Sequence, residues 1–213
     1  MQTDELAHLL ATGLEPTPPG AARRRWTFAL TSSATTAAAL MLLWLGLEPA
    51  LPRVATLPMF WVKLGLPLAL CAGALLAVIR LARPGAALGA APWFAAVPVL
   101  LIWALAAVVL QRAAPEARSA LLFGQTWQVC PLYITSLAAP TFLAAWWALR
   151  GLAPTRQRST GAAAGLLAGA VGALVYTFHC PELAAPFIAV WYVLGMCLPA
   201  VLGAVLGPSL LRW

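Results

Sequence analysis

Two cysteines and a neighbouring histidine are the residues of this sequence whose types and spacing suit chemistry. Cys130 lies in the run WQVCP over 127–131, and Cys180 follows His179 in the run HCPE over 179–182. Two thiols that meet can form a structural disulfide, which needs Cα atoms about 4.4 to 6.8 Å apart. They can also act as a switch that is oxidised, or that binds a soft metal ion such as Cu(I) or Zn²⁺ with help from His179. The sequence leaves both interpretations, and inert thiols, open.

The elements that must position these residues are set by composition. Of the 213 residues, 62% are hydrophobic and 9% are charged, whereas soluble domains are about one quarter charged. Six apolar runs reach the length of about 20 residues that a spanning helix needs, and their continuity favours helices over a β-barrel. The sequence therefore predicts an all-α integral membrane bundle of six transmembrane helices over 26–213, preceded by a cytoplasmic tail over 1–25. The predicted spans are 27–47, 59–80, 92–111, 128–149, 160–178 and 186–207.

The distribution of arginine predicts the orientation. With the N-terminus inside, the outer loops carry only Arg53, Arg112 and Arg118, and the positive-inside rule then places both termini in the cytoplasm. Lys63, near the outer end of the second span, is expected to snorkel to the membrane surface. We expect a multi-pass protein of the bacterial inner membrane. The arginines assigned to the inner side are Arg23, Arg24, Arg25, Arg80, Arg83, Arg150, Arg156, Arg158 and Arg212.

The same topology brings the two cysteines together. Spans four and five are joined by a short inner loop and should be antiparallel neighbours, so Cys130 and Cys180 lie at one level on the outer side. In a bacterium that side is oxidising. Cys130 begins a helix, where the dipole favours a thiolate, and is expected to be the more reactive of the two thiols. Glu182 is expected to pair with His179 when the histidine is charged.

Glycines predict how the helices pack. Gly161, Gly165 and Gly169 recur every four residues in the fifth span, and Gly203 and Gly207 do so in the sixth. Small residues let backbones approach closely in a membrane, where lipid provides no hydrophobic driving force. We expect the fifth span to pack on the sixth or the fourth. A seam between two copies in a homo-oligomer is the alternative.

The tail predicts a binding segment for a protein partner. Asp4 and Glu5 suit the first turn of a short helix, and Leu6, Leu9 and Leu10 then share one face. Helices that lie on membranes are usually basic, whereas this one is acidic and should be attracted to a basic groove on a protein. Residues 15–22 read as a tether to the membrane.

Several function classes are disfavoured. Ion-coupled carriers place ionisable groups at mid-membrane, and no span has an Asp, Glu or Arg well inside it. No Walker loop, HExxH or CxxC motif occurs, which argues against an enzyme, including a thiol oxidoreductase. The net charge of +7 is spread between the spans and reflects topology, so no direct contact with nucleic acid is expected. No cofactor is expected beyond a transiently bound metal ion. A membrane transporter or channel for a metal or small molecule remains the alternative function.

Several segments together resemble the NrsF family of small bacterial inner-membrane proteins, which are negative regulators of extracytoplasmic-function sigma factors. The segments are TDEL over 3–6, Arg23 to Arg25, Trp127 with Cys130, HCPE over 179–182, FIAVWY over 187–192 and the stretch from Gly203 to Trp213.

The resemblance implies a six-span anti-sigma factor. Its cytoplasmic portion would sequester an extracytoplasmic-function sigma factor through the tail that holds Asp4, Glu5, Leu6, Leu9 and Leu10, with or without the inner loops. The sigma factor would be released on periplasmic heavy-metal or oxidative stress. The paired cysteines of the family match Cys130 and Cys180, so the resemblance assigns the sensing role to them.

Overall fold

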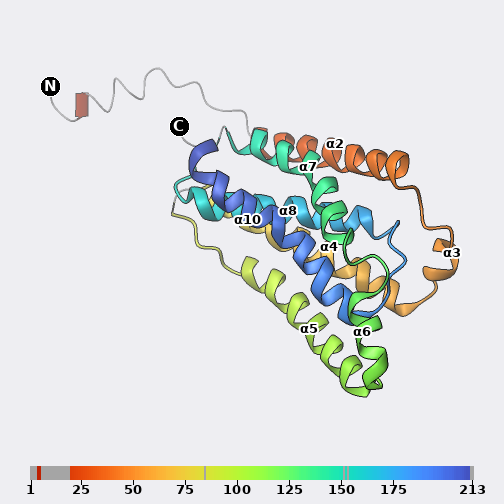
Figure 1. Cartoon of the computed structure of the whole chain (residues 1–213). Coiled ribbons are helices and arrows are strands. Elements are labelled where there is room, and N and C mark those ends of the chain that lie inside the picture. Colours follow the sequence, from red (N-terminus) through yellow and green to blue (C-terminus); the bar gives the residue numbers. More distant parts are fainter. Residues whose placement is uncertain (1–3, 6–19, 84, 151, 153, 212–213) are drawn as a thin grey trace.

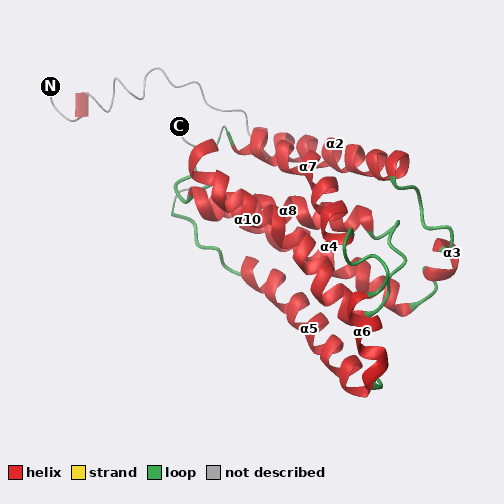
Figure 2. Ribbon diagram, viewed as in Figure 1, coloured by secondary structure: helices red, strands yellow, loops and turns green. Residues whose placement is uncertain are grey.

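The computed structural model describes residues 4–5, 20–83, 85–150, 152 and 154–211, and these are helical or loop, with no strand among them (Figures 1 and 2). Six helical segments are long and apolar enough to cross a membrane, which confirms the predicted all-α fold. They are α2 (Ala21–Trp44), α4 (Pro58–Leu81), α5 (Ala91–Arg112), α7 (Cys130–Leu149), α8 (Gln157–Tyr176) and a last segment of α9 (Ala185–Phe187), the π-helix η1 (Ile188–Tyr192) and α10 (Val193–Leu210).

The ends of the helices follow from local sequence. α4, α5, α7 and α9 each have a proline at the first or second position, where the missing N–H costs no hydrogen bond. Short helices α3 (Leu51–Val54) and α6 (Pro115–Phe123) lie in two of the connections. α2 begins at Ala21, after Gly20 in a left-handed conformation, so the last five residues of the predicted tail belong to this helix. Asp4 and Glu5 are helical and exposed, whereas Leu6, Leu9 and Leu10 lie outside the described residues.

α8 is the centre of the bundle and packs against α10, α7 and α4 (Figure 1). A Cβ atom added at Gly161 would collide with the carbonyl of Gly203 on α10, and one at Gly165 would collide with that of Pro199. The predicted packing of the fifth span on the sixth is confirmed. The alternative, in which these glycines form a seam between two copies, is wrong because α10 of the same chain covers them.

Consecutive spans run in opposite directions, so the two ends of the bundle differ. Trp26 of α2, Val78 of α4, Leu149 of α7 and Leu211 after α10 share one buried cluster. Met41, Leu66, Cys130, Tyr176 and Cys180 share another. The first cluster lies at the end that carries the arginines at the start of α2, near the end of α4 and just after α7, and the cysteines lie at the other end. The separation of the cysteines from the arginine-rich end is therefore a property of the fold.

A matched pair of alanine substitutions tests the role of the α8 glycines. Gly161→Ala places a methyl group against the backbone of α10, which cannot retreat without opening the helix pair, and should destabilise the protein by about 1 to 3 kcal/mol. Gly65→Ala is the control, since nothing lies within 4 Å of its added Cβ, and alanine favours the helix. Thermal unfolding in detergent measures both. Equal stability of the two variants would contradict the packing.

Candidate functional site

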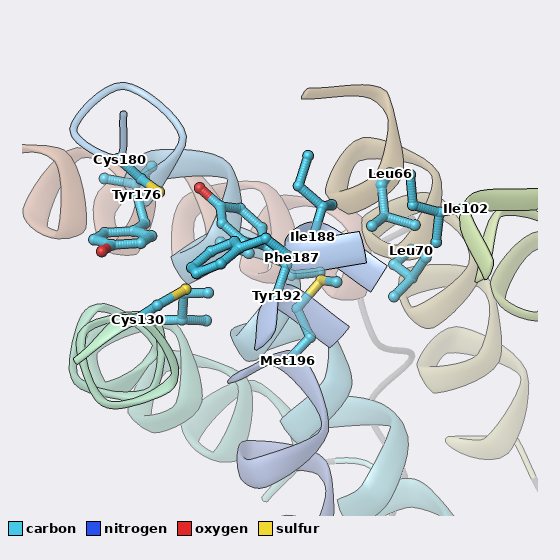
Figure 3. Packing of buried hydrophobic residues seen from close by; sticks show 14 of the residues in the cluster. Leu66, Leu70, Ile102, Cys130, Tyr176, Cys180, Phe187, Ile188, Tyr192 and Met196 are labelled. Carbon is cyan, nitrogen blue, oxygen red and sulfur yellow. The ribbon is translucent and has the colours of Figure 1, made fainter. Parts of the chain in front are cut away.

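Cys130 and Cys180 lie in one buried cluster in the core of the bundle. Cys130 is the first residue of α7, and Cys180 lies in the loop that follows α8. Their side chains are 0% and 2% exposed, and both are free thiols. Tyr176, Phe187 and the cysteines belong to one buried cluster (Figure 3). The structure thus brings together the pair that the antiparallel order of the spans predicted.

A lysine that the sequence placed at the membrane surface lies beside this pair. Lys63 of α4 is fully buried, and its Nζ atom donates hydrogen bonds to the carbonyls of Cys180 at 2.6 Å and Glu182 at 2.9 Å. The same Nζ atom is 5.2 Å from the centre of the Tyr192 ring. Two carbonyls and an aromatic face offset part of the cost of removing an ammonium group from water. The expectation that Lys63 snorkels is therefore wrong.

The surroundings of Cys180 favour its thiolate. A hydrogen bond from the Cys130 thiol, the charge of Lys63 and the backbone N–H of Glu182 hold the pKa of Cys180 below its usual value, although burial acts in the opposite direction. The sequence favoured Cys130 as the more reactive thiol, on the basis of its position at a helix start. The groups that stabilise an anion converge instead on Cys180, so the structure favours a thiolate at that residue rather than at the helix start.

His179 is adjacent to Cys180 in sequence but faces another part of the molecule. Its Nδ1 atom is 3.0 Å from the carbonyl oxygen of Gly46, and its ring lies against Tyr133 and Tyr176. Among the residues that the structure describes, no group of three or more His, Cys, Asp or Glu side chains is arranged to hold a metal ion. The predicted ligand set of Cys130, Cys180 and His179 is thus not assembled, and the Nδ1 atom of His179 contacts the connection after α2 instead. The two thiols remain together.

The loop that carries Cys180 is held from several sides. The Glu182 carboxylate accepts a hydrogen bond of 2.6 Å from the backbone N–H of Gln125, in the connection before α7, rather than pairing with His179. The backbone N–H of Glu48 donates to the carbonyl of Phe178 at 3.0 Å. With Lys63 on α4, three separate parts of the chain fix this loop. A movement of Cys180 would therefore disturb the contacts of all three parts with the loop.

The π-helix η1 completes the site. π-bulges in helices occur frequently at functional sites, and this one brings the fully buried Tyr192 beside Lys63 and Cys180. Its irregular backbone is supported by Trp103 of α5, whose indole N–H donates to the carbonyl of Ala189 at 2.9 Å. Sequence reasoning missed Lys63 and Tyr192. A lysine inside an apolar run was the available signal, since an ionisable residue there suggests a functional site.

The arginine-rich end joins the tail to the bundle. The guanidinium of Arg25, in the second turn of α2, lies 4.4 Å from the ring centre of Trp147 and donates a hydrogen bond to its carbonyl. Trp147 is in the last turn of α7, the helix that Cys130 begins. One helix therefore contacts both the cysteine site and the base of the tail.

Comparisons with known proteins show which family the chain belongs to. The family model described as "NrsF: Negative regulator of sigma F" matches residues 10–213. The chain is 49% identical to the "Probable anti-sigma-F factor NrsF" of Azospira oryzae, and the alignment covers all of both chains. It is 38% identical to the "Anti-sigma-F factor NrsF" of Caulobacter vibrioides, again over all of both chains. No solved structure matches. A match of the family model from residue 10 to the last residue, with two full-length relatives of that name, shows that the chain belongs to the NrsF family of negative regulators of sigma F.

Proposed function

We propose that this protein is a non-enzymatic anti-sigma factor that holds an extracytoplasmic-function sigma factor at the bacterial inner membrane and releases it on a periplasmic signal. The names of the relatives and the six apolar helices support this role. The observation that carries the sensing part is the buried cluster of Cys130, Cys180 and Lys63 at the end opposite the arginines. The positive-inside rule assigns that end to the periplasm.

The chemistry of the signal follows from the two sulfurs. A peroxide can accept two electrons from the Cys180 thiolate and the Cys130 thiol. A disulfide then forms, one proton is released from the thiol, and the peroxide O–O bond breaks to give a hydroxyl compound and hydroxide. A thiophilic metal ion can instead bind both sulfurs and displace the same proton. Either event removes the free thiolate beside Lys63 and leaves this buried ammonium without its anion, which disfavours the present arrangement of the loop.

α7 is the route by which this change reaches the sigma factor. The helix begins at Cys130 and, near its other end, receives the contact from Arg25 of α2. The tail with Asp4, Glu5, Leu6, Leu9 and Leu10 is joined to α2 at Gly20. A signal can release the partner only if it favours a state of lower affinity, and a displaced α7 would alter the base of the tail.

Removal of the tail should free the sigma factor. Deletion of residues 2–14 leaves the helical bundle intact, and we expect the partner to be lost from the membrane fraction and its reporter promoter to become constitutively active. Co-purification and reporter activity measure this. Substitution of Leu6, Leu9 and Leu10 by serine should have the same effect, with Asp4→Asn and Glu5→Gln weaker. Unchanged co-purification after the deletion would place binding elsewhere in the chain.

Loss of either paired sulfur should abolish the response. Cys130→Ser or Cys180→Ser prevents both a disulfide and two-sulfur binding of a metal, so the reporter should no longer change on exposure to peroxide or cadmium. Cys71→Ser and Cys197→Ser are the matched controls, since neither residue lies at the pair, and both should respond normally. A normal response in both paired-cysteine variants would exclude the proposed sensor.

Lys63→Met tests the electrostatics of the site. Methionine keeps much of the volume but removes the charge, so the pKa of Cys180 should rise and its thiolate population at pH 7 should fall, by about tenfold for each further unit once the pKa exceeds 7. The rate of alkylation by a small maleimide in a Cys71→Ser, Cys197→Ser background measures this. As the pH is lowered, the alkylation rate of the unsubstituted protein should fall only near the lowered pKa of Cys180. In the Lys63→Met variant the fall should begin at a higher pH.

The exposed Arg53, at the same end of the bundle, provides the control. Arg53→Met should leave the rate and its pH profile unchanged. If Lys63→Met also leaves both unchanged, Lys63 does not stabilise the thiolate.

A further inference from the structure

A cavity of about 280 Å³ opens between α2 and α4 at the arginine-rich end of the bundle. Apolar side chains line most of it, including Trp26 and Leu30 of α2 and Leu75 and Ile79 of α4. Two charged residues also line it, Arg23 in the first turn of α2 and Arg83 just after α4. The site therefore combines an apolar slot with two guanidinium groups.

The arrangement of the helices accounts for this cavity. α2 packs on α7 and α8, and α4 packs on α8 and α5. α2 and α4 therefore approach each other without forming a closed interface. In a bundle that crosses a bilayer, a slot between two such helices faces lipid.

The slot has the direction of an acyl chain and is long enough to take part of one. Leu30 follows Arg23 by seven residues, which corresponds to about 10 Å along the helix axis, and Leu75 precedes Arg83 by eight, which corresponds to about 12 Å. The apolar lining thus extends from the arginines toward the middle of the membrane on both walls. An amphiphile with its head at the arginines would follow the same direction.

The two arginines define the head group. Both are exposed, and neither forms an ion pair with another residue in the part of the chain that the structure describes. Guanidinium groups bind phosphate in a fork geometry. They lie at the end that the arginine distribution assigns to the cytoplasm, where anionic lipids attract basic residues.

We propose that this cavity is a binding site for an anionic phospholipid, whose phosphate is held by Arg23 and Arg83 and whose acyl chain lies between α2 and α4. The acidic tail of the same chain is a less suitable occupant, because the deeper part of the slot lies between two spans, at the depth of hydrocarbon. The site does not depend on the proposed anti-sigma activity or on the cysteines.

Native mass spectrometry of the full chain in detergent tests the site, with phosphatidylglycerol and phosphatidylcholine of identical acyl chains as probes. We expect phosphatidylglycerol to be retained at least fivefold more than phosphatidylcholine. The Arg23→Gln, Arg83→Gln double variant should lose this preference. Arg53→Gln with Arg112→Gln, which removes two exposed arginines at the other end of the bundle, is the matched control and should keep it.

A second pair of variants tests the apolar slot with both arginines in place. Ile79→Trp should fill the cavity and reduce retention of phosphatidylglycerol at least fivefold. Leu76→Trp, at an exposed position of the same helix outside the lining, should not. Thermal unfolding of each variant shows whether it is folded, and added phosphatidylglycerol should raise the midpoint only where the site is intact.

Four results would overturn the proposal. The first is equal retention of the two lipids by the unsubstituted protein. The second is an equal loss of the preference in both double-arginine variants. The third is a fivefold or greater gain in phosphatidylglycerol retention after deletion of residues 2–19, which would show that the tail occupies the slot. Displacement of the lipid by inorganic phosphate alone would likewise show that the acyl chain makes no contribution.

Discussion

The close approach of α8 to its neighbours is the constraint on which the rest of the structure depends. Lipid tails are as apolar as leucine, so helices in a bilayer associate through packing and hydrogen bonds rather than through the hydrophobic effect. Gly161 and Gly165 admit the backbone of α10, and Gly172, on another side of the helix, admits that of α7 at Ile134. Because backbone meets backbone on two sides, α8 cannot rotate or slide without a collision. Its end, and the loop with Cys180, are fixed accordingly.

The end of α8 also explains how a lysine can be buried there. The last turn of a helix and the residues after it present carbonyl groups without partners, and these form the negative end of the helix dipole. Lys63 satisfies two carbonyls just beyond this end, those of Cys180 and Glu182. Its ammonium therefore replaces water as their donor. The same contacts bring a positive charge to the cysteine pair, so this one side chain contributes both to the anchoring of the loop and to the lowered pKa of Cys180.

The sequence predicts the parts of this protein that the bilayer dictates. A fixed membrane thickness demands six apolar runs of similar length, and short connections force antiparallel neighbours, so the spans and the meeting of Cys130 with Cys180 could be foreseen. The position of the Lys63 side chain could not be predicted, because it can extend either to the membrane surface or into the bundle. The carbonyl of Cys180 that binds it inside the bundle lies more than 100 residues away in the sequence. The predicted role of His179 beside the cysteines could not be judged from the sequence for the same reason, since its partner Gly46 belongs to another connection. The π-helix has no periodic signal in the sequence.

The position of the cysteines at the start of α7, rather than on a peripheral helix, matters for the proposed mechanism. α5 is the least buried of the six spans, and movement there could be absorbed by lipid. α7 packs between α2 and α8, and its contact with α8 at Gly172 leaves no free space for a local adjustment. A change in the separation of the two sulfurs would thus have to displace α7 relative to α8 or strain the loop after α8. Displacement of α7 alters the contact of Trp147 with Arg25, and through this contact it would change the position of the tail.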